Sequence, residues 1–190
     1  CGAERVLVPG GAPHRRRVRA LACAPGRQDC VGSGETLRTV IRTAGEWDAE
    51  SIAVLSGQLG YPTEIGAVRQ RLRAIAGRPD HAVFVPEAAG QVIGWVHVYE
   101  VITPESPAHA EIGGLVVDAA HRGRGIGRRL MEAAEDWARG KGLSSVRLRS
   151  NVVRAEAHAF YEGIGYTVVK TQKVFAKTLQ ALPGGDRDKP

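Results

Sequence analysis

The spacing of hydrophobic residues changes along this 190-residue chain, and each change separates an expected helix from an expected strand. Apolar residues three and four positions apart predict one face of a helix, whereas alternation predicts a half-buried strand. Helical spacing occurs in 46–61, between Thr63 and Gly77, from Ile126 to Gly140, and in 154–164. Strand-like spacing occurs in 36–44, 81–85, 91–101, 109–118, 144–150 and 166–179, the last as a strand or a hairpin. The expected order is therefore β-α-α-β-β-β-α-β-α-β.

This order of elements predicts one α/β domain in which helices pack on a mixed sheet. Two turns support it: residues 86–90 would close a hairpin, and residues 103–107 would form a loop before the next strand. Residues 1–34 are rich in Arg, Gly, Ala and Pro with little periodicity, so we expect a flexible basic tail there. We therefore place the domain at 36–179 and a loose C-terminal tail at 180–190.

The net charge of +6 is concentrated at the start of the chain. Residues 1–34 hold six Arg, one Glu and one Asp, which is +4, so +2 remains for the other 156 residues. The body therefore lacks the basic stripe that is typical of nucleic-acid binding, and we expect no nucleic-acid partner. No apolar run approaches the roughly 18 residues of a membrane helix, so we expect no membrane partner either.

All three cysteines, Cys1, Cys23 and Cys30, lie in the same initial segment. Their spacing fits no C-x-x-C metal pair, and the His and acidic residues show no metal-ligand spacing, so we expect no metal site. The body has no cysteine to serve as a disulfide partner or as a thiol nucleophile. This composition suits a reducing compartment, and we expect a cytoplasmic protein.

A glycine-rich segment between a strand pattern and a helix pattern is the main chemical signal in the chain. The apolar run 112–117 ends at Asp118, the turn RGRGIG follows at 122–127, and a helix-forming segment comes next. Glycines allow positive φ and a close backbone approach, and the N–H groups at a helix N-terminus attract phosphate. Arginines within and after the turn add positive charge. The segment therefore predicts a site for a phosphorylated ligand.

The spacing of these glycines distinguishes between three phosphate-binding patterns. The dinucleotide pattern G-x-G-x-x-G, started at Gly123, meets Arg128 where its third glycine belongs. The P-loop pattern needs a lysine that this turn lacks. The pattern R/Q-x-x-G-x-G/A is matched at every fixed position by Arg122, Gly125 and Gly127. A plain structural turn is the alternative to any ligand site.

A second motif lies in the expected helix 154–164. Its sequence, R-x-x-A-H-x-F-Y-E-x-x-G-Y from Arg154 to Tyr166, is similar to the segment A-x-x-[FY]-Y-E-x-x-G-[FY] of the GCN5-related N-acetyltransferases (GNAT). The glycine turn resembles the coenzyme A pyrophosphate loop of the same family, and with the order of elements residues 36–179 resemble a GNAT domain. The resemblance implies an α/β fold with a mixed, mostly antiparallel central sheet, splayed at the cofactor strand and flanked by helices.

The resemblance also implies acetyl-CoA as the acetyl donor. Its pantetheine arm would pair with the backbone of the central strand, and its pyrophosphate would lie on the amides of the turn. By the family pattern the binding residues are Leu115, Val116, Val117, Arg122, Gly123, Arg124, Gly125, Ile126, Gly127 and Arg128. The side chain of Arg122 has a plain surface charge as its alternative role. Many members carry an Asn that contacts the cofactor where this chain has Arg154; Asn151 would substitute for it, or serve only as a turn residue.

Transfer of an acetyl group to an amine needs a proton acceptor, oxyanion stabilisation and a proton donor for the leaving thiolate. By the family match Tyr161 would be the general acid, and its alternative role is a core aromatic beside Phe160. Glu111, which alternates with Ile112 on the central strand, is the candidate base, with an ordinary surface carboxylate as the alternative. Backbone N–H groups near Val116 would stabilise the oxyanion. The other candidate bases are His97, His109 and His158.

Two functions follow from the resemblance. The first is an N-acetyltransferase that moves acetyl from acetyl-CoA to a primary amine by direct attack in a ternary complex. The second is a non-catalytic acyl-CoA-binding or regulatory module of the same fold. The acceptor would be a small-molecule amine or a protein amine, in a site shaped by the first two helices, residues 61–63 and residues 103–107. The family often forms dimers, so a homodimer is compatible with the resemblance.

Overall fold

The computed structural model describes residues 38–179. The expected basic tail at 1–34, the first residues of the expected domain at 36–37 and the expected tail at 180–190 lie outside the described residues. The domain boundaries therefore stay predictions, and the helices and strands below all fall within 38–179.

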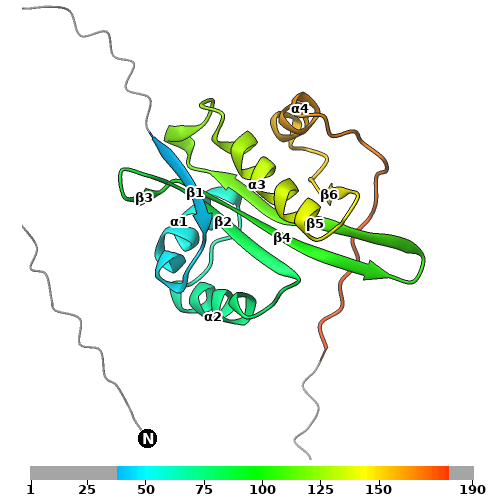
Figure 1. Ribbon diagram of the computed structural model, residues 1–190, viewed down its shortest axis with the longest axis horizontal. Coiled ribbons are helices and arrows are strands. Elements are labelled where there is room, and N and C mark those ends of the chain that lie inside the picture. Colours follow the sequence, from blue (N-terminus) through cyan, green and yellow to red (C-terminus); the bar gives the residue numbers. More distant parts are fainter. Residues whose placement is uncertain (1–37, 180–190) are drawn as a thin grey trace, which may run out of the picture. The chain divides into compact units, whose positions relative to one another are not determined.

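A six-stranded sheet forms the centre of the described domain (Figure 1). Its strands are Thr39–Thr43 (β1), His81–Ala88 (β2), Gln91–Val92 (β3), Gly94–Thr103 (β4), Ser106–Val117 (β5) and Val146–Leu148 (β6). They are ordered β1-β2-β4-β5-β6, with β3 paired to β2. Every pair among the described strands is antiparallel except β5–β6, which is parallel. The expected mixed, mostly antiparallel sheet is confirmed.

Helices cover both faces of this sheet. The helical elements are the 3-10 turns Glu46–Asp48 (η1) and Ala119–His121 (η2) and the α-helices Ala49–Leu59 (α1), Ile65–Ala76 (α2), Ile126–Gly140 (α3) and Ala155–Gly163 (α4). Figure 1 shows α1 and α2 on one face and α3 and α4 on the other. These α-helices lie in the segments where apolar residues recur at helical spacing.

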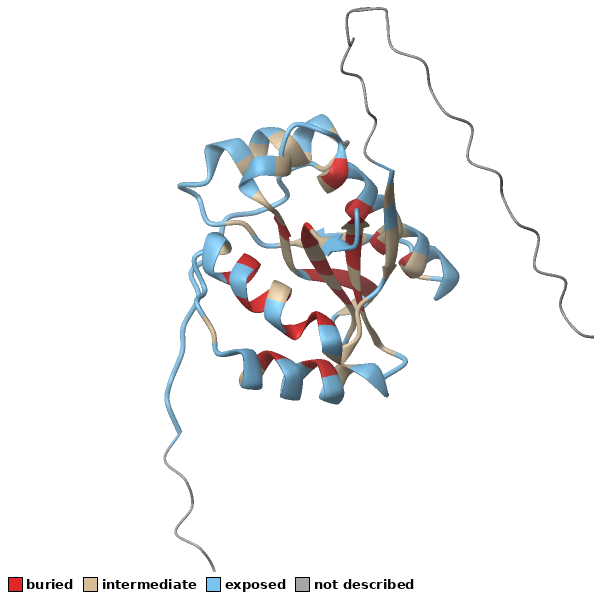
Figure 2. Ribbon diagram, turned by 90° about the vertical axis from the view of Figure 1, so that its left-hand side faces the viewer, coloured by how far each residue is buried: buried red, intermediate tan, exposed pale blue. Residues whose placement is uncertain are grey.

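Each face of the sheet has its own hydrophobic core (Figure 2). On the α3 face, Leu130 packs with Val96 and Val98 of β4. On the other face, α1 and α2 pack on Val83 and Val85 of β2. Burying one aliphatic side chain contributes about 1.5–3 kcal/mol. The apolar stripes that predict the helices are therefore also what holds them on the sheet.

Strands β5 and β6 part after a short stretch of pairing. The parallel register covers only Ala110 to Ile112 of β5, although β5 continues to Val117. On that side, the last residues of β5 carry backbone groups that no described strand pairs with. The splay that the family resemblance implies is confirmed. On its other side β5 has a register shift against β4, where Gly113 is an extra residue in a β-bulge.

Strands β2, β4 and β5 extend further than the spacing predicts, and the prolines at 86 and 107 do not end β2 and β5. The prediction ends the second strand at Val85, but β2 continues through Pro86 to Ala88. One stretch of β2 pairs with β4 and a later stretch pairs with β3, and Pro86 lies between the two. The N–H group that proline lacks would make no ladder hydrogen bond at this position. The expected loop at 103–107 is a tighter turn, in which Thr103 pairs with Ser106 at the start of β5.

The expected last strand or hairpin at 166–179 is wrong, because the structure assigns no strand to these residues. Alternation in this segment does not separate apolar from polar positions: Phe175 shares one side with Lys173, and Val174 shares the other with Lys170. Neither side therefore offers a continuous apolar face to bury against the sheet. Phe175 is 88% exposed, in line with this mixed pattern.

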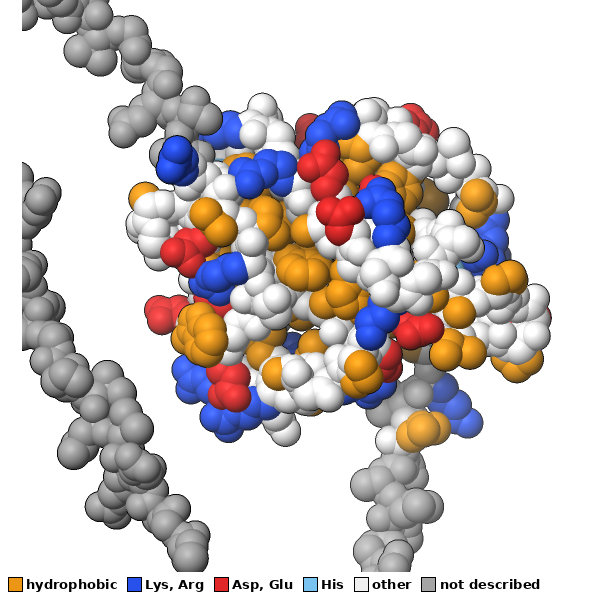
Figure 3. Space-filling view, in the orientation of Figure 1, with side chains coloured by type: hydrophobic (Ala, Val, Ile, Leu, Met, Phe, Trp, Pro, Cys, Tyr) orange, Lys and Arg blue, Asp and Glu red, His pale blue; other side chains and the backbone are white. Residues whose placement is uncertain are grey.

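Charged side chains of both signs share the surface of the described domain. On the face shown in Figure 3, Lys and Arg side chains lie among Asp and Glu side chains, with hydrophobic ones between them. Across residues 38–179, no helix combines the length and the apolar character that crossing a bilayer requires.

Candidate active site

The glycine turn between β5 and α3 has the backbone that its sequence predicts. Gly123 and Gly125 have φ of 73° and 75°, in the left-handed region that favours glycine. Gly125 is also the N-cap of α3, so the first N–H groups of this helix follow it directly. A Cβ atom added at either glycine would meet nothing within 4 Å, which leaves the turn open on that side. The expected order of strand, glycine turn and helix is confirmed.

Side chains of the turn are engaged with the fold. Arg122 donates from Nε to the carbonyl of Val117 at 3.1 Å, and Arg128 donates to the carbonyl of Gly163 at 3.3 Å. The side chain of Ile126 is buried in the α3-face core. These contacts hold the turn against the ends of β5 and α4. Arg124 is exposed and makes no such contact among the described residues, so its side chain and the backbone amides of the turn are left to bind an anion.

Successive residues of β5 point their backbone N–H and C=O groups to opposite edges of the strand. Asp118 donates its N–H to the carbonyl of the residue between β3 and β4, so by alternation Val116 also points towards β4. Leu115 and Val117 then point to the edge where β6 has parted from β5. The bond from Arg122 to the Val117 carbonyl agrees with this direction. Of the three expected strand residues, Leu115 and Val117 present backbone groups to the open edge.

Helix α4 brings the second motif into contact with the first. A Cβ added at Gly127 would lie 3.1 Å from the ring of Phe160 and 3.8 Å from Val117. The absence of a side chain at this position therefore allows the ring to pack over the start of α3. Phe160 in turn meets Tyr161 edge to face, with 5.2 Å between the ring centroids. The predicted general acid thus lies beside the ring that covers the glycine turn.

Tyr161 is half-buried against the core of the α3 face, and its ring centroid is 6.1 Å from that of Tyr166. Burial raises the pKa of the Tyr161 phenol, and the positive charge of Arg154 opposes this in part. The phenol therefore keeps its proton at neutral pH, which is the state that a proton donor needs. The ring packing is also what the core-aromatic alternative predicts.

Asn151 makes the turn contacts that its alternative role predicts. Its side-chain oxygen accepts from the N–H of Val153 at 3.2 Å, as in an Asx turn. Its carbonyl oxygen lies 3.0 Å from Nε2 of His158, so this candidate base contacts the same turn. Arg154, at the position of the family's Asn, donates to the carbonyl of Leu59 at the end of α1. These contacts join the start of α4 to α1.

Glu111 projects away from the α3-face core that contains Ile112, as alternation predicts, but its carboxylate is enclosed rather than exposed. The residue is 7% exposed. One carboxylate oxygen is 3.0 Å from Nε of Arg149, and the other is 3.9 Å from Nε2 of His109. Two of the candidate bases, Glu111 and His109, thus belong to one buried polar group. Within residues 38–179, no three or more His, Cys, Asp or Glu side chains are grouped so as to hold a metal ion.

A hollow of about 460 Å³ lies on the α1–α2 face of the sheet, next to β4 and β5. It is lined by Ser56, Leu59, Tyr61, Pro62, Thr63, Arg71, Trp95 and Gly113. Of the segments expected to shape the acceptor site, residues 61–63 line this hollow and residues 103–107 do not. Sequence reasoning missed Trp95 and Gly113. The available signal is the Gly113-Gly114 pair inside an apolar strand, because glycine there often marks a bulge or a close approach.

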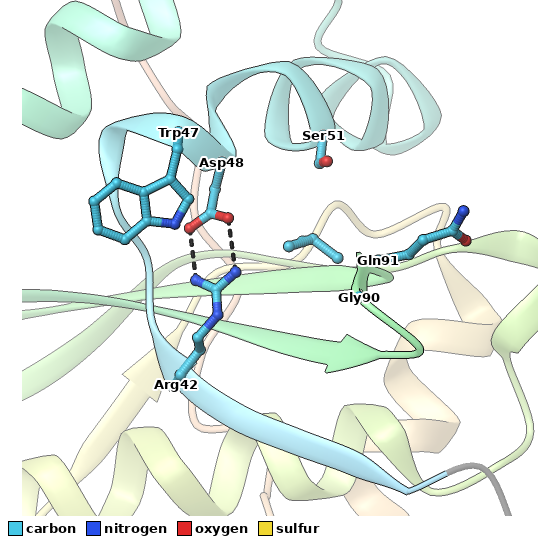
Figure 4. A pocket seen from close by; sticks show the side chains of 7 residues that line it. Arg42, Trp47, Asp48, Ser51, Gly90 and Gln91 are labelled. Atoms are coloured by element: carbon cyan, nitrogen blue, oxygen red, sulfur yellow. Dashed lines mark hydrogen bonds and ion pairs between the residues drawn. The ribbon is translucent and has the colours of Figure 1, made fainter. Parts of the chain in front are cut away.

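A second hollow, of about 420 Å³, lies at the start of α1 (Figure 4). Two nitrogens of Arg42 donate to Asp48 at 2.8 and 2.9 Å, and Nε donates to Glu87 at 2.7 Å. Burial by itself raises the pKa of Asp48, but the hydrogen bonds from Arg42 and from the Gly45 amide outweigh it and leave that pKa below its ordinary value. The charges of Asp48 and Glu87 are thus paired with that of Arg42. None of the predicted site residues lines this hollow.

The glycine turn, the splayed strand and the α4 motif are combined in one known family. The family model described as "Acetyltransferase (GNAT) family" matches residues 40–166. The chain belongs to this family. The GNAT match includes the turn at 122–127 and the motif that ends at Tyr166.

Relatives of known sequence and structure agree with the GNAT assignment. The uncharacterised N-acetyltransferase YhdJ of Bacillus subtilis is 32% identical over 124 residues, which cover 65% of this chain and 86% of that protein. N-acetyltransferase 8B of Rattus norvegicus is 31% identical over 102 residues, which cover 53% of this chain and 45% of that protein. The aminoglycoside N-acetyltransferase AAC(6')-Iy, solved in complex with CoA, matches with a TM-score of 0.69 at 18% identity, over 76% of this chain and 97% of that chain. This last likeness shows the fold.

Proposed function

We propose that this GNAT domain transfers an acetyl group from acetyl-CoA to a primary amine. The observation that carries the proposal is the arrangement at the start of α3. An open glycine turn lies there next to the unpaired edge of β5, and the helix that bears Tyr161 packs against the turn. The parts that acetyl transfer needs are therefore close together.

The residues around the turn fit acetyl-CoA. The N–H groups that begin α3, after two glycines with positive φ, would hold its pyrophosphate. The outward backbone groups of Leu115 and Val117 would pair with its pantetheine arm. When bound, acetyl-CoA supplies an acetyl group activated as a thioester. The shared fold with AAC(6')-Iy, whose structure contains CoA, supports this assignment.

Groups of the chain would serve each charge that develops during transfer. Whichever outward N–H group next to Val116 the pantetheine arm leaves free would stabilise the carbonyl oxygen as it becomes negative. Tyr161, which keeps its proton at neutral pH, would protonate the leaving thiolate. Glu111 is the sequence-derived candidate for accepting the amine proton, although its carboxylate already binds Arg149. The attack would be direct, in a ternary complex, because the body has no cysteine to carry the acetyl group.

The acceptor amine is proposed to bind in the hollow beside Trp95 and Gly113. This hollow adjoins β5 on the face opposite α3, so an acceptor there would approach the strand from the side of α1 and α2. We propose a small-molecule amine or a protein amine as the acceptor. The cytoplasm is the proposed location, since the cysteine-free body suits a reducing compartment.

A non-catalytic acyl-CoA-binding module is the second candidate, and one observation favours it. The carboxylate of Glu111 is engaged by Arg149 and His109, so it is not poised for proton transfer as it stands. Such a module would keep the turn and the open edge of β5 but would release no coenzyme A.

Binding and turnover measured together test both candidates. Acetyl-CoA at 100 times its Kd should stabilise the fold by about 2.7 kcal/mol, because it binds only the native state. A thermal shift with acetyl-CoA and thiol release that depends on an added amine would support the enzyme. The same shift without release across a broad amine panel would support the module. A shift with ATP but none with acetyl-CoA would overturn the cofactor assignment.

A further inference from the structure

The hollow proposed for the acceptor carries charge of one sign. Among the described residues that line it, Arg71 is the only charged one, and none is an acid. The rest of the lining is uncharged and comes from α1, the loop 61–63, β4 and β5. Glu64, which follows Thr63 in the chain, does not line the hollow. A ligand bound there therefore meets one positive charge and no carboxylate.

The charge of Arg71 has no carboxylate partner in the described part of the chain. Arg71 lies on α2, and the helix positions three and four residues away from it are occupied by Ala, Val, Ala and Ile. An acidic side chain at one of these positions would pair with it along the helix. Arg73 shows the contrast, because its Nε lies 2.6 Å from a carboxylate oxygen of Glu46. Folding therefore leaves the charge of Arg71 free to meet a ligand.

A hydrogen bond holds the guanidinium of Arg71 at the hollow. Its Nη1 donates to the hydroxyl oxygen of Thr63 at 3.0 Å, and Thr63 lines the same hollow. Within residues 38–179 this is the one polar contact of the Arg71 side chain, so the N–H groups on Nε and Nη2 have no protein acceptor. Arg78 uses the same two nitrogens to bind both carboxylate oxygens of Asp80, at 3.1 and 2.7 Å. The Nε–Nη2 edge of Arg71 can therefore bind a carboxylate through two hydrogen bonds.

The hollow has a helix wall and a sheet wall. Arg71 and Thr63 come from α2 and from the loop before it, whereas Trp95 and Gly113 come from β4 and β5. Gly113 precedes by two residues Leu115, whose backbone groups face the open edge of β5 where the pantetheine arm is proposed to bind. An acceptor with its amine towards β5 and an anionic group towards α2 fits this arrangement of the two walls.

We propose that the acceptor is a small-molecule amine that carries a carboxylate or a phosphate, and that Arg71 binds this anionic group. The inference rests on the proposed function and names the substrate class of its acceptor site. The volume of about 460 Å³ falls within the roughly 300–1,000 Å³ of small-molecule sites. Thr63 is a positioning residue, because its hydroxyl holds Nη1 of Arg71 and leaves the other edge of the guanidinium to the ligand.

Polycationic amines fit this hollow poorly. A polyamine or an aminoglycoside carries several positive charges, which would meet the guanidinium of Arg71 without a lining carboxylate to offset it. Like charges brought together in a site that is partly removed from water raise the free energy of binding. The lining therefore favours an anionic amine over both of these classes.

Matched pairs of amines test the anionic group with the full chain and acetyl-CoA. Each pair differs in one anionic group: an amino acid and its amide, or aminoethyl phosphate and ethanolamine. We expect the anionic member to have the higher kcat/KM by about 10–10², the range for charge-assisted hydrogen bonds. The pair with the larger ratio distinguishes a carboxylate from a phosphate. Spermidine and an aminoglycoside should be poorer acceptors than the anionic amines.

Substitutions separate recognition of the anion from the reactivity of the amines themselves. Arg71→Met removes the charge and keeps a helix-forming residue, so the preference for the anionic member should disappear, mainly through a higher KM. Arg71→Lys keeps the charge without the two-nitrogen edge, and Thr63→Val removes the hydroxyl that holds it, so both should retain part of the preference. Arg69→Met is the matched control, because Arg69 lies on the same helix, carries the same charge and does not line the hollow. It should keep the wild-type preference.

Titration of the same amines into the protein saturated with CoA measures binding without transfer. The anionic members should bind more tightly than their neutral partners in the wild type, and this difference should be absent in Arg71→Met. Equal binding of both members in the wild type, an unchanged preference in Arg71→Met, or loss of the preference in Arg69→Met overturns the inference. A polyamine, an aminoglycoside or a peptide that is a better acceptor than every anionic small amine also overturns it.

Each of these outcomes leaves acetyl transfer standing. Wild-type protein that turns over no amine would instead overturn the proposed function. The titration with CoA would then still decide whether Arg71 binds the anionic group.

Discussion

Two roles are proposed for Tyr161, and they use different atoms of one side chain. Its ring packs beside Phe160, whereas its hydroxyl would protonate the leaving thiolate. Tyr161→Phe keeps the ring and removes only the proton. We expect kcat to fall by about 10², the low end for loss of a general acid. The loss is at the low end because a thiol is already a fair leaving group, with a pKa of roughly 8.5 for cysteine.

Measuring kcat and the melting temperature on the same preparation separates the two roles. The deficit of Tyr161→Phe should be smaller on the acidic side of neutrality, where solvent can supply the proton. The thermal shift with acetyl-CoA should be close to that of the wild type. Wild-type turnover together with a lowered melting temperature would leave Tyr161 with its packing role alone.

Single side chains differ in how far the sequence predicts them. The left-handed backbone at Gly125 follows from a local pattern, because only glycine adopts it without strain. The enclosure of Glu111 does not, since its partner Arg149 comes from beyond β6 and meets it only once the sheet has formed. The contact between His81 and His97 likewise depends on the register of β2 with β4, which no local spacing specifies.

At the scale of elements, the turn between β5 and α3 can be tested with two substitutions at one position. Gly125 has φ of 75°, so Gly125→Ala and Gly125→Glu share a backbone penalty of about 1–2 kcal/mol. Only Glu adds a negative charge where the pyrophosphate is proposed to lie. A carboxylate near a helix N-terminus is itself stabilising, so Glu should not be the less stable of the two.

Acetyl-CoA titrations followed by thermal shift compare the two variants. We expect Gly125→Ala to retain a reduced shift and Gly125→Glu to lose it. Equal shifts in both variants would remove the turn from the cofactor site, because they would show that added charge there has no effect.

Helices are better predicted than strands in this chain, for a physical reason. The apolar stripes of the α-helices recur within each helix, so they are readable without knowing the partner. The end of β2 depends on whether Pro86 faces a ladder hydrogen bond, which only the neighbouring strands decide. The mistaken strand at 166–179 shows the converse, because β-prone residues without one apolar face gave no strand.

At the scale of the whole molecule, both hydrophobic cores and all predicted site residues fall within 38–179. Deleting residues 1–34 should therefore leave the melting temperature and kcat nearly unchanged. The deletion also removes +4 of the net charge, so both quantities should be compared at two salt concentrations. A large loss of either one would show that the initial segment contributes to the folded domain.

The same truncated protein tests whether transfer is direct. All three cysteines lie within residues 1–34, so the shortened chain has no thiol that could carry an acetyl group. If the amine attacks the thioester in a ternary complex, the shortened chain should keep its turnover, and double-reciprocal plots at several acceptor concentrations should intersect. An acetyl-enzyme would give parallel lines, with label from acetyl-CoA retained on the denatured protein. Parallel lines in the full chain that disappear with the deletion would assign the acetyl carrier to one of the three cysteines. Intersecting lines and unlabelled protein in both chains would support direct attack in a ternary complex, with no acetyl-enzyme.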